Sequence, residues 1–219
     1  MNAATGRLDD VQDNDPTDDP LPFHEPAVQY HLVLSYYVLA TSLLDDLAST
    51  DIPLQRLAAL RQLWSQLILR AASGQLCDLI AAHNPTAQGD SLTYYQRLAQ
   101  AKSGSIFALA FGGTAALLSD DAGFVQLFVG IGEIFGTLVQ YGDDLLDDTH
   151  QPNATLTLPA AYAQAVGEYP AALRPNHASG YWVHLRQHYV RHVDALVAQR
   201  YPALGEPIHA IFVRAFGAS

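Results

Sequence analysis

Four aspartates lie within six residues in the second half of the chain. Asp143, Asp144, Asp147 and Asp148 close the segment GEIFGTLVQYGDDLLDD, residues 132–148. Because helical side chains recur about every 3.6 residues, the first three share one face of a helix. Such carboxylates repel one another unless cations lie among them, and an acidic last turn also opposes the helix dipole. Because Mg²⁺ binds through a few carboxylates plus substrate phosphates, this spacing indicates a metal-diphosphate site.

The same spacing occurs near the start of the chain. Asp9, Asp10 and Asp13, in LDDVQDNDP, again follow the i, i+1, i+4 pattern. If the two acidic helices face each other, six carboxylates point into one cavity, which predicts a cage for three metal ions. One acidic triplet would be weak support, because acidic pairs are common on protein surfaces. Two triplets flanking a long, mostly apolar chain are far more specific.

Three other features could contribute chemistry. Lys102 lies in the apolar middle of its segment, so its ammonium either reaches water or has an anionic partner, and we favour the partner. His184, His188 and His192 follow an i, i+4, i+8 pattern, but no Cys or ordered acidic partner accompanies them. A solvated helix face is therefore expected. Cys77, the single cysteine, is expected in the core and suggests a reducing compartment.

Long helices are needed to hold these side chains, and the apolar periodicity predicts them. Leucines recur at i, i+3, i+4 and i+7 after Pro53, and no segment alternates as a strand would. Residues 119–121 are predicted to cap the helix that carries the acidic segment. The expected helices cover residues 27–49, a segment from residue 51 or 53 to 83, residues 91–118, 122–148 and 160–166, and two segments from 180 onward. The fold class is all-α, in a single domain over residues 1–219.

The first of these helices, residues 27–49, is expected to be buried on most sides, since apolar residues dominate it. Asp45 and Asp46 near its end, with Asp51, are an alternative for the first acidic motif. Acidic residues close to Pro53 are also ordinary helix-end chemistry, and this is the interpretation we favour.

The charge balance narrows the classes of partner. The chain has 22 acidic and 11 basic residues, a formal charge of −11, which repels nucleic acid and anionic membranes. Phosphate substrates would be repelled too, unless metal ions invert the local field. The N-terminus has no apolar signal segment. Two segments are the most apolar. Residues 105–118 are too few to span a bilayer, and residues 122–142 are interrupted by polar residues. We therefore expect core helices, no stable membrane span and a cytoplasmic protein.

Several motifs follow one another in an order that is typical of one enzyme family. After LDDVQDNDP and His24, they are Gly74, Gln75, Asp78 and Leu79; Tyr95, Lys102 and Ser103; Gly132, Gly136, Gln140, Asp143, Asp144 and Asp147; and Thr157, Leu158 and Pro159. Over roughly the first 160 residues the chain resembles the trans-isoprenyl diphosphate synthases, or polyprenyl synthetases. The resemblance implies the type I isoprenoid synthase helical bundle and a Mg²⁺-dependent prenyltransferase.

The resemblance also implies roles for individual residues. The metal ligands would be Asp9, Asp10, Asp13, Asp143, Asp144 and Asp147, holding three Mg²⁺ ions that grip an allylic prenyl diphosphate. Lys102 would neutralise charge on the departing diphosphate, and Gln75 would contact the substrate. Gln140 and Ser103 would lie near the forming carbocation. Apolar helix faces would enclose the prenyl tail and exclude water.

The departures from the family pattern concern the acceptor side. Only eight residues precede Asp9, so the first family helices, with their GGKxxR segment, are not in this sequence. Asp18 and Asp19 stand where the family has paired arginines, and the lysine expected before TLP is replaced by Thr155 or a neighbour. Each lost charge-assisted contact costs about 1.5–3 kcal/mol. These changes disfavour a second diphosphate at that position.

Several interpretations of the function therefore stay open. The acceptor is isopentenyl diphosphate, a peptide side chain, or the substrate's own double bonds as in a terpene cyclase. The alternative from another class is a noncatalytic or regulatory subunit of a heteromeric prenyl diphosphate synthase. The family forms helical dimers, so a homodimer or a heterodimer with a related chain is expected. A misplaced start or a truncation would also explain the short N-terminus, and the prenyl chain length is not given by the sequence.

Overall fold

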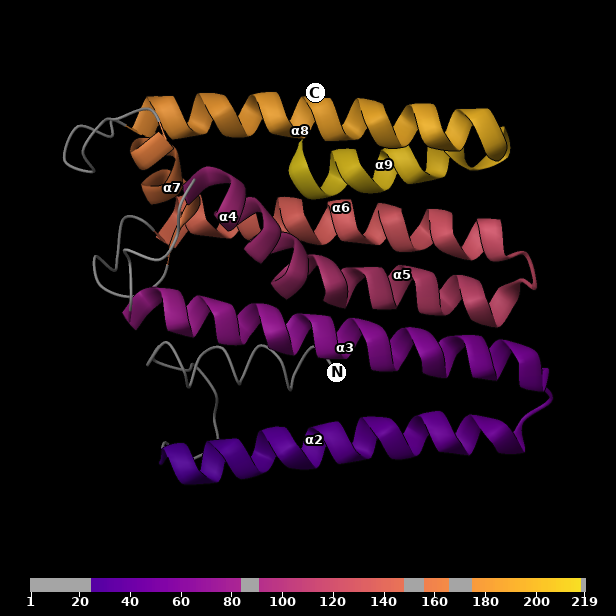
Figure 1. Ribbon diagram of the computed structural model, residues 1–219. Coiled ribbons are helices and arrows are strands. Elements are labelled where there is room, and N and C mark those ends of the chain that lie inside the picture. Colours follow the sequence, from indigo (N-terminus) through magenta and orange to yellow (C-terminus); the bar gives the residue numbers. More distant parts are fainter. Residues whose placement is uncertain (1–24, 84–90, 148–155, 166–174, 218–219) are drawn as a thin grey trace. The chain divides into compact units, whose positions relative to one another are not determined.

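The computed structural model describes residues 25–83, 91–147, 156–165 and 175–217 (Figure 1). The acidic motif at Asp9, Asp10 and Asp13, together with Asp18, Asp19 and His24, lies outside the described residues. Every regular element in the described ranges is helical, and none is a strand. The prediction of an all-α fold is therefore confirmed.

The chain separates into two compact units, Met1–Arg61 and Gln62–Ser219, which are described in turn. In the first unit, α2 (Pro26–Asp46) is followed by a 3-10 turn, η1 (Leu47–Ser49), and by the start of α3 (Leu54–His83). Arg61 of α3 pairs with Asp45 at the end of α2, with 2.8 Å between Nη2 and Oδ1. Asp45 therefore has a local ion-pair partner. The single domain over residues 1–219 stays a prediction.

The expectation that α2 is buried on most sides is wrong. Leu34, Val38, Leu39 and Leu43 are exposed, at 55–57 % of their surface. Their positions spread around the helix rather than along one face, so the few neighbouring residues of this unit cannot cover them all.

The second unit holds the larger part of α3, from Gln62 onward, and the remaining helices. After α3 the chain forms α4 (Ser91–Ala99), a π-helical turn η3 (Gln100–Gly104) and α5 (Ser105–Leu118) in one continuous run. It then reverses into α6 (Ala122–Asp147), and α7 (Leu158–Ala165), α8 (Pro175–Arg200), the 3-10 turn η5 (Pro202–Leu204) and α9 (Gly205–Phe216) follow. Helices α5 and α6 lie side by side, and α8 and α9 cover α6 from the other side (Figure 1).

Helix α6 is at the centre of the second unit because both of its sides are packed. Ile131, Leu138 and Tyr141 of α6 are almost completely buried. They belong to one apolar cluster with Leu158 at the start of α7 and with residues of α8 and α9, among them Val193. Burying each such side chain contributes about 1.5–3 kcal/mol, so this cluster fixes the direction of α6. The acidic end of α6 is therefore held by a rigid helix.

Local sequence signals set several of the helix ends. The Asp121 carboxylate accepts a hydrogen bond from the backbone N–H of Gly123 at 2.8 Å, which confirms the predicted cap of α6. Helix α8 begins at Pro175, earlier than expected from residue 180. Proline is tolerated in the first turn of a helix, because the N–H that it lacks would have no partner there.

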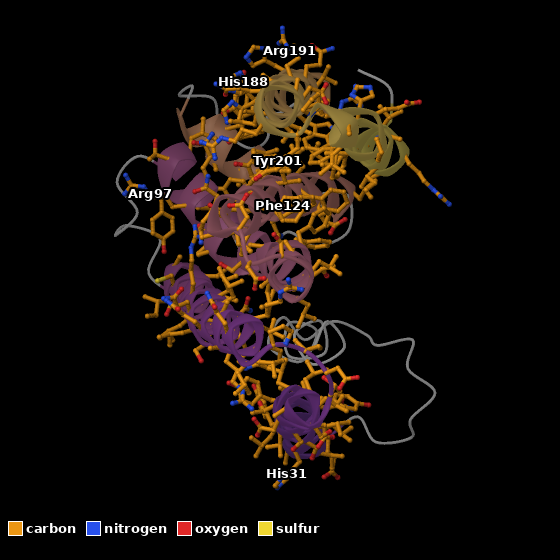
Figure 2. All side chains as sticks on the ribbon, turned by 90° about the vertical axis from the view of Figure 1, so that its right-hand side faces the viewer. His31, Arg97, Phe124, His188, Arg191 and Tyr201 are labelled. Atoms are coloured by element: carbon orange, nitrogen blue, oxygen red, sulfur yellow. The ribbon has the colours of Figure 1, made fainter. Side chains whose placement is uncertain are left out.

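Two predictions about single side chains have opposite outcomes. His184, His188 and His192 are exposed, which confirms the solvated helix face, and Figure 2 shows His188 on the outer side of α8. Cys77 is exposed, so its assignment to the core is wrong. It follows exposed Leu76 in α3, and an apolar residue type does not by itself ensure burial.

In the part of the chain that the structure describes, three helical segments are long and apolar enough to cross a membrane, judged by length and composition alone: Ala27–Ser49, Ser91–Leu118 and Ala122–Leu146. The most apolar windows of the second and third are 44 % and 39 % buried inside the structure, against 6 % for the first. The expectation that none of them spans a membrane stays a prediction.

Candidate functional site

A π-helical turn positions two of the predicted site residues. Between α4 and α5 the backbone widens into η3, which contains Lys102 and Ser103. Single π-helical turns inside α-helices are rare and are frequently found at functional sites. Here the turn lets adjacent side chains reach different helices: Lys102 contacts α3, and Ser103 contacts α6.

Glycines allow the neighbouring helices to approach this turn. A Cβ atom on Gly136 of α6 would lie 2.5 Å from the Ser103 carbonyl oxygen. A Cβ atom on Gly74 of α3 would lie 2.8 Å from the Lys102 backbone nitrogen. Both distances are too short for real atoms, so only glycine fits at these positions. The two glycines therefore bring the backbones of α3 and α6 against the turn.

The Lys102 ammonium has an anionic partner, as predicted. Its Nζ lies 3.1 Å from Oδ2 of Asp78 on α3, and the two side chains are only 13 % and 4 % exposed. A buried charge needs such a partner, because moving it out of water is costly. Gln75 lies on the same helix, one turn before Asp78. Its contact with substrate stays a prediction.

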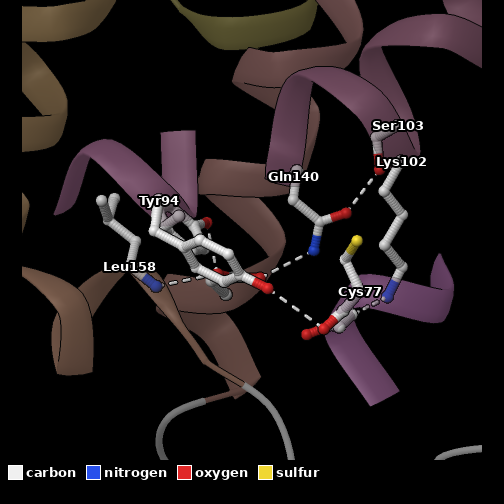
Figure 3. A network of polar contacts seen from close by, with 9 residues as sticks. Cys77, Tyr94, Lys102, Ser103, Gln140 and Leu158 are labelled. Carbon is white, nitrogen blue, oxygen red and sulfur yellow. Dashed lines mark hydrogen bonds and ion pairs between the residues drawn. The ribbon is translucent and has the colours of Figure 1, made fainter. Parts of the chain in front are cut away.

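A second polar network joins η3 to the acidic end of α6 (Figure 3). The Ser103 hydroxyl donates to Oε1 of Gln140, and Nε2 of Gln140 donates to Oδ1 of Asp144 at 2.8 Å. The other oxygen of Asp144, Oδ2, accepts from the Tyr95 hydroxyl and from the backbone N–H of Leu158, the latter at 2.8 Å. Three of the predicted site residues are thus directly connected.

The Asp144 carboxylate is buried, with only 7 % of the residue exposed. Burial raises its pKa to about 6, although hydrogen bonds from Tyr95, Gln140 and the Leu158 N–H, together with the charge of Lys102, act in the opposite direction. Burial, followed by the neighbouring Asp144 charge, also holds the pKa of Tyr95 well above its usual range. The network therefore keeps Tyr95 as a hydrogen-bond donor.

The neighbouring Asp143 lies in a different environment, because its side chain is exposed at the end of α6. Its carboxylate oxygens are the ligand type that Mg²⁺ prefers, so this residue fits a role as a metal ligand. Asp147 ends α6, but its side chain lies outside the described part of the chain. Within the described ranges, no three His, Cys, Asp or Glu side chains come close enough to hold a metal ion.

Comparison with known proteins identifies the family. A family model described as polyprenyl synthetase matches residues 7–156, which is more than half of the chain. The chain belongs to the polyprenyl synthetase family. No curated protein and no solved structure matches it.

Membership of this family gives the fold of the chain and a coarse indication of its function. The all-α architecture is that of the family's isoprenoid synthase fold. Membership supports a prenyltransferase-like function and places the chain among proteins of isoprenoid biosynthesis. The matched region contains the predicted residues of α3, η3 and α6, and it ends just before Leu158.

Two contacts of the candidate site could not be predicted from the sequence. Asp78 belongs to one of the motifs, but the sequence does not predict that it pairs with Lys102. Arg70 of α3 forms two 3.0 Å hydrogen bonds with the Glu133 carboxylate of α6, about two turns before Gln140. The signal in the sequence was a glutamate within a mostly apolar stretch of the helix. A charge in such a place indicates a partner but does not identify it.

Proposed function

We propose that this protein is a Mg²⁺-dependent prenyltransferase that acts on an allylic prenyl diphosphate. The observation that carries this proposal is the polar network that joins the Lys102–Ser103 turn through Gln140 to the acidic end of α6. It brings the residues of three family motifs together within one compact unit. Family membership supports the same reaction class.

The proposed reaction begins with loss of diphosphate. The bond between C1 of the prenyl group and the diphosphate oxygen breaks, and both electrons leave with the diphosphate. A double bond of the acceptor then supplies the electrons for the new bond, and a proton is lost. Bound Mg²⁺ would neutralise the charge that grows on the leaving diphosphate. Asp143 is exposed and fits as a ligand of this ion, and Asp9, Asp10, Asp13 and Asp147 are proposed beside it.

The side chains of the network would assist each stage. Lys102, the only lysine of the sequence, would attract the leaving diphosphate, and Asp78 keeps its ammonium in position. The Oε1 atom of Gln140 faces Ser103, so an electron-rich oxygen is available on the side where the carbocation is proposed to form. We propose the apolar faces of the surrounding helices as the site of the prenyl tail, since water would react with the cation.

The acceptor is the open part of the proposal. Asp18 and Asp19 disfavour a second diphosphate where the family has arginines, so isopentenyl diphosphate, a peptide side chain and an internal double bond are all retained. The same substitutions favour the second candidate, a noncatalytic or regulatory subunit that needs a related partner chain. A homodimer or heterodimer is proposed for either function.

Turnover by the purified chain tests the proposal. The chain is incubated with Mg²⁺ and geranyl or farnesyl diphosphate, with and without isopentenyl diphosphate, and both diphosphate release and lipid products are measured. Elongated product identifies a synthase. Release without elongation indicates cyclisation, hydrolysis or another acceptor. Absence of release from the chain alone refutes an independent enzyme and favours the subunit function.

Two variants make the test specific. Asp143→Ala should abolish Mg²⁺-dependent release, because it removes an exposed carboxylate that is proposed as a metal ligand. Arg97→Ala is the matched control: it removes an exposed charge from the last turn of α4, and it should keep wild-type turnover. Full activity of Asp143→Ala would remove the acidic end of α6 from the proposed site.

A further inference from the structure

The adjacent aspartates at the end of α6 differ in what surrounds them. Asp143 is exposed, whereas Asp144 is buried and accepts hydrogen bonds on both carboxylate oxygens. Its donors come from three segments: Tyr95 of α4, Gln140 of α6 and the backbone of Leu158. A carboxylate has about four acceptor positions, and three of them are used here. Mg²⁺ usually keeps several of its waters, and a carboxylate as buried as Asp144 leaves little room for them.

The direction of each hydrogen bond in this network follows from groups that cannot reverse. The Leu158 N–H can only donate, and an ionised Asp144 can only accept. The Gln140 side chain must therefore present its NH₂ group to Asp144, which leaves its oxygen facing Ser103. The charge of Asp144 thus determines which end of the Gln140 amide faces η3.

We propose that Asp144 is a positioning residue rather than a metal ligand, and that it acts by holding the Gln140 oxygen toward Ser103 and the reacting prenyl group. This rests on the proposed function, because the oxygen is useful there only if positive charge develops beside it. Asp143 then binds the metal ion, and these two adjacent aspartates of one motif have separate roles. An oxygen dipole that already faces the developing cation stabilises it without reorganisation.

The isosteric variant Asp144→Asn separates charge from shape. Because the Leu158 N–H still needs an acceptor, the new oxygen must face Leu158, and the new NH₂ group must face Gln140. Gln140 can then accept only by rotating its amide, which points its own NH₂ group at Ser103. The Ser103 hydroxyl can accept in turn, so no hydrogen bond is lost. The network is reversed, but it is not broken.

The kinetic test compares Asp144→Asn with Asp143→Asn. Asp144→Asn should lower kcat by about 100-fold, as removal of one oriented dipole from a site commonly does. Its KM and its half-saturating Mg²⁺ concentration should stay within about twofold of wild type. Asp143→Asn should instead raise the Mg²⁺ requirement. If Asp144→Asn raises that requirement as Asp143→Asn does, or keeps the wild-type kcat, the proposal is overturned.

A double variant tests whether Asp144 acts through Gln140. Once Gln140→Leu has removed the amide, adding Asp144→Asn should cause little further loss of kcat. Losses that multiply independently would overturn the positioning role.

An NMR measurement tests whether the Gln140 amide rotates in Asp144→Asn. It does so even if the chain has no turnover and the proposed function fails. In the wild type, the Gln140 side-chain NH₂ protons should show Overhauser contacts to the Asp144 β protons. In Asp144→Asn they should show contacts to the Ser103 β protons. Unchanged contacts in the variant would overturn the reversal of the network, whatever the activity of the chain.

Discussion

Gly136→Ala should disturb the site through one added methyl group. The new Cβ atom would lie 2.5 Å from the Ser103 carbonyl oxygen and 2.8 Å from Cδ2 of Phe107. An ordinary contact begins at 3.4 Å, so α6 and η3 would have to separate by about 0.9 Å. The Ser103 contact is with backbone, which cannot rotate away as a side chain can.

The magnitude follows from two opposing effects. Overpacking of this kind costs about 1–3 kcal/mol, whereas replacing a helical glycine by alanine returns about 1 kcal/mol. Gly130→Ala is the matched control, because it lies on the same helix and its Cβ would meet nothing within 4 Å. The gain in helix propensity is common to both variants and cancels in the comparison. We therefore expect Gly136→Ala to be less stable than Gly130→Ala by about 1–3 kcal/mol.

Urea unfolding followed by circular dichroism measures this difference, and turnover measured at a temperature where both variants are folded gives its functional effect. Because Ser103 donates to Gln140, a displaced Ser103 should also lower kcat in Gly136→Ala, while Gly130→Ala keeps it. Equal stability and equal turnover of the two variants would refute the close packing of η3 against α6.

Three further predictions test other parts of the site. Asp78→Asn should lower the free energy of unfolding by about 3 kcal/mol in urea titrations, because it leaves the buried Lys102 ammonium without its carboxylate; a loss below about 1 kcal/mol would contradict the buried pair. A double-mutant cycle of Arg70→Ala and Glu133→Ala should give a coupling of about 1 kcal/mol, modest because the side chains are 40 % and 27 % exposed; strict additivity would exclude a stabilising pair. Without Mg²⁺, the stability of the chain should fall as pH rises from about 4 to about 6, because the raised pKa of Asp144 makes the folded state bind its proton more tightly than the unfolded state. The shift from 3.8 to about 6 corresponds to about 3 kcal/mol, and Asp144→Asn should remove this contribution to the slope; an unchanged slope would assign the pH dependence to other groups.

The helices were predictable because their signals are local. Leucine periodicity predicts α3 with a start at residue 51 or 53, close to the observed start at Leu54, and Asp121 predicts the cap of α6. The π-turn was not predictable, because residues 100–104 continue the helical pattern of α4 and α5. Its position against Gly74 and Gly136 depends on backbone contacts between helices far apart in the sequence.

The candidate site was predicted by residue type but not by environment. The sequence indicated that Lys102 has an anionic partner, but Asp78 lies 24 residues away and was one of many aspartates. The spacing alone predicts that Asp143 and Asp144 are both metal ligands. Neighbouring helical residues point about 100° apart, and the packing of Tyr95 and Leu158 decides that only one of them is buried. Tertiary packing of this kind is not encoded in the spacing.

The buried charges of the second unit favour an enzyme over a noncatalytic subunit. Lys102, Asp78 and Asp144 are largely removed from water, and replacing a buried ion pair by apolar residues of similar size is often neutral or stabilising. A subunit that only needed to fold and pair would gain nothing from keeping them. The three side chains together carry a net negative charge, so an anionic substrate is attracted only when cations accompany it. Burying these charges is costly, and their net negative charge favours an anionic substrate that binds together with metal ions. Such charges are expected in a site that has to bind a diphosphate and then release it.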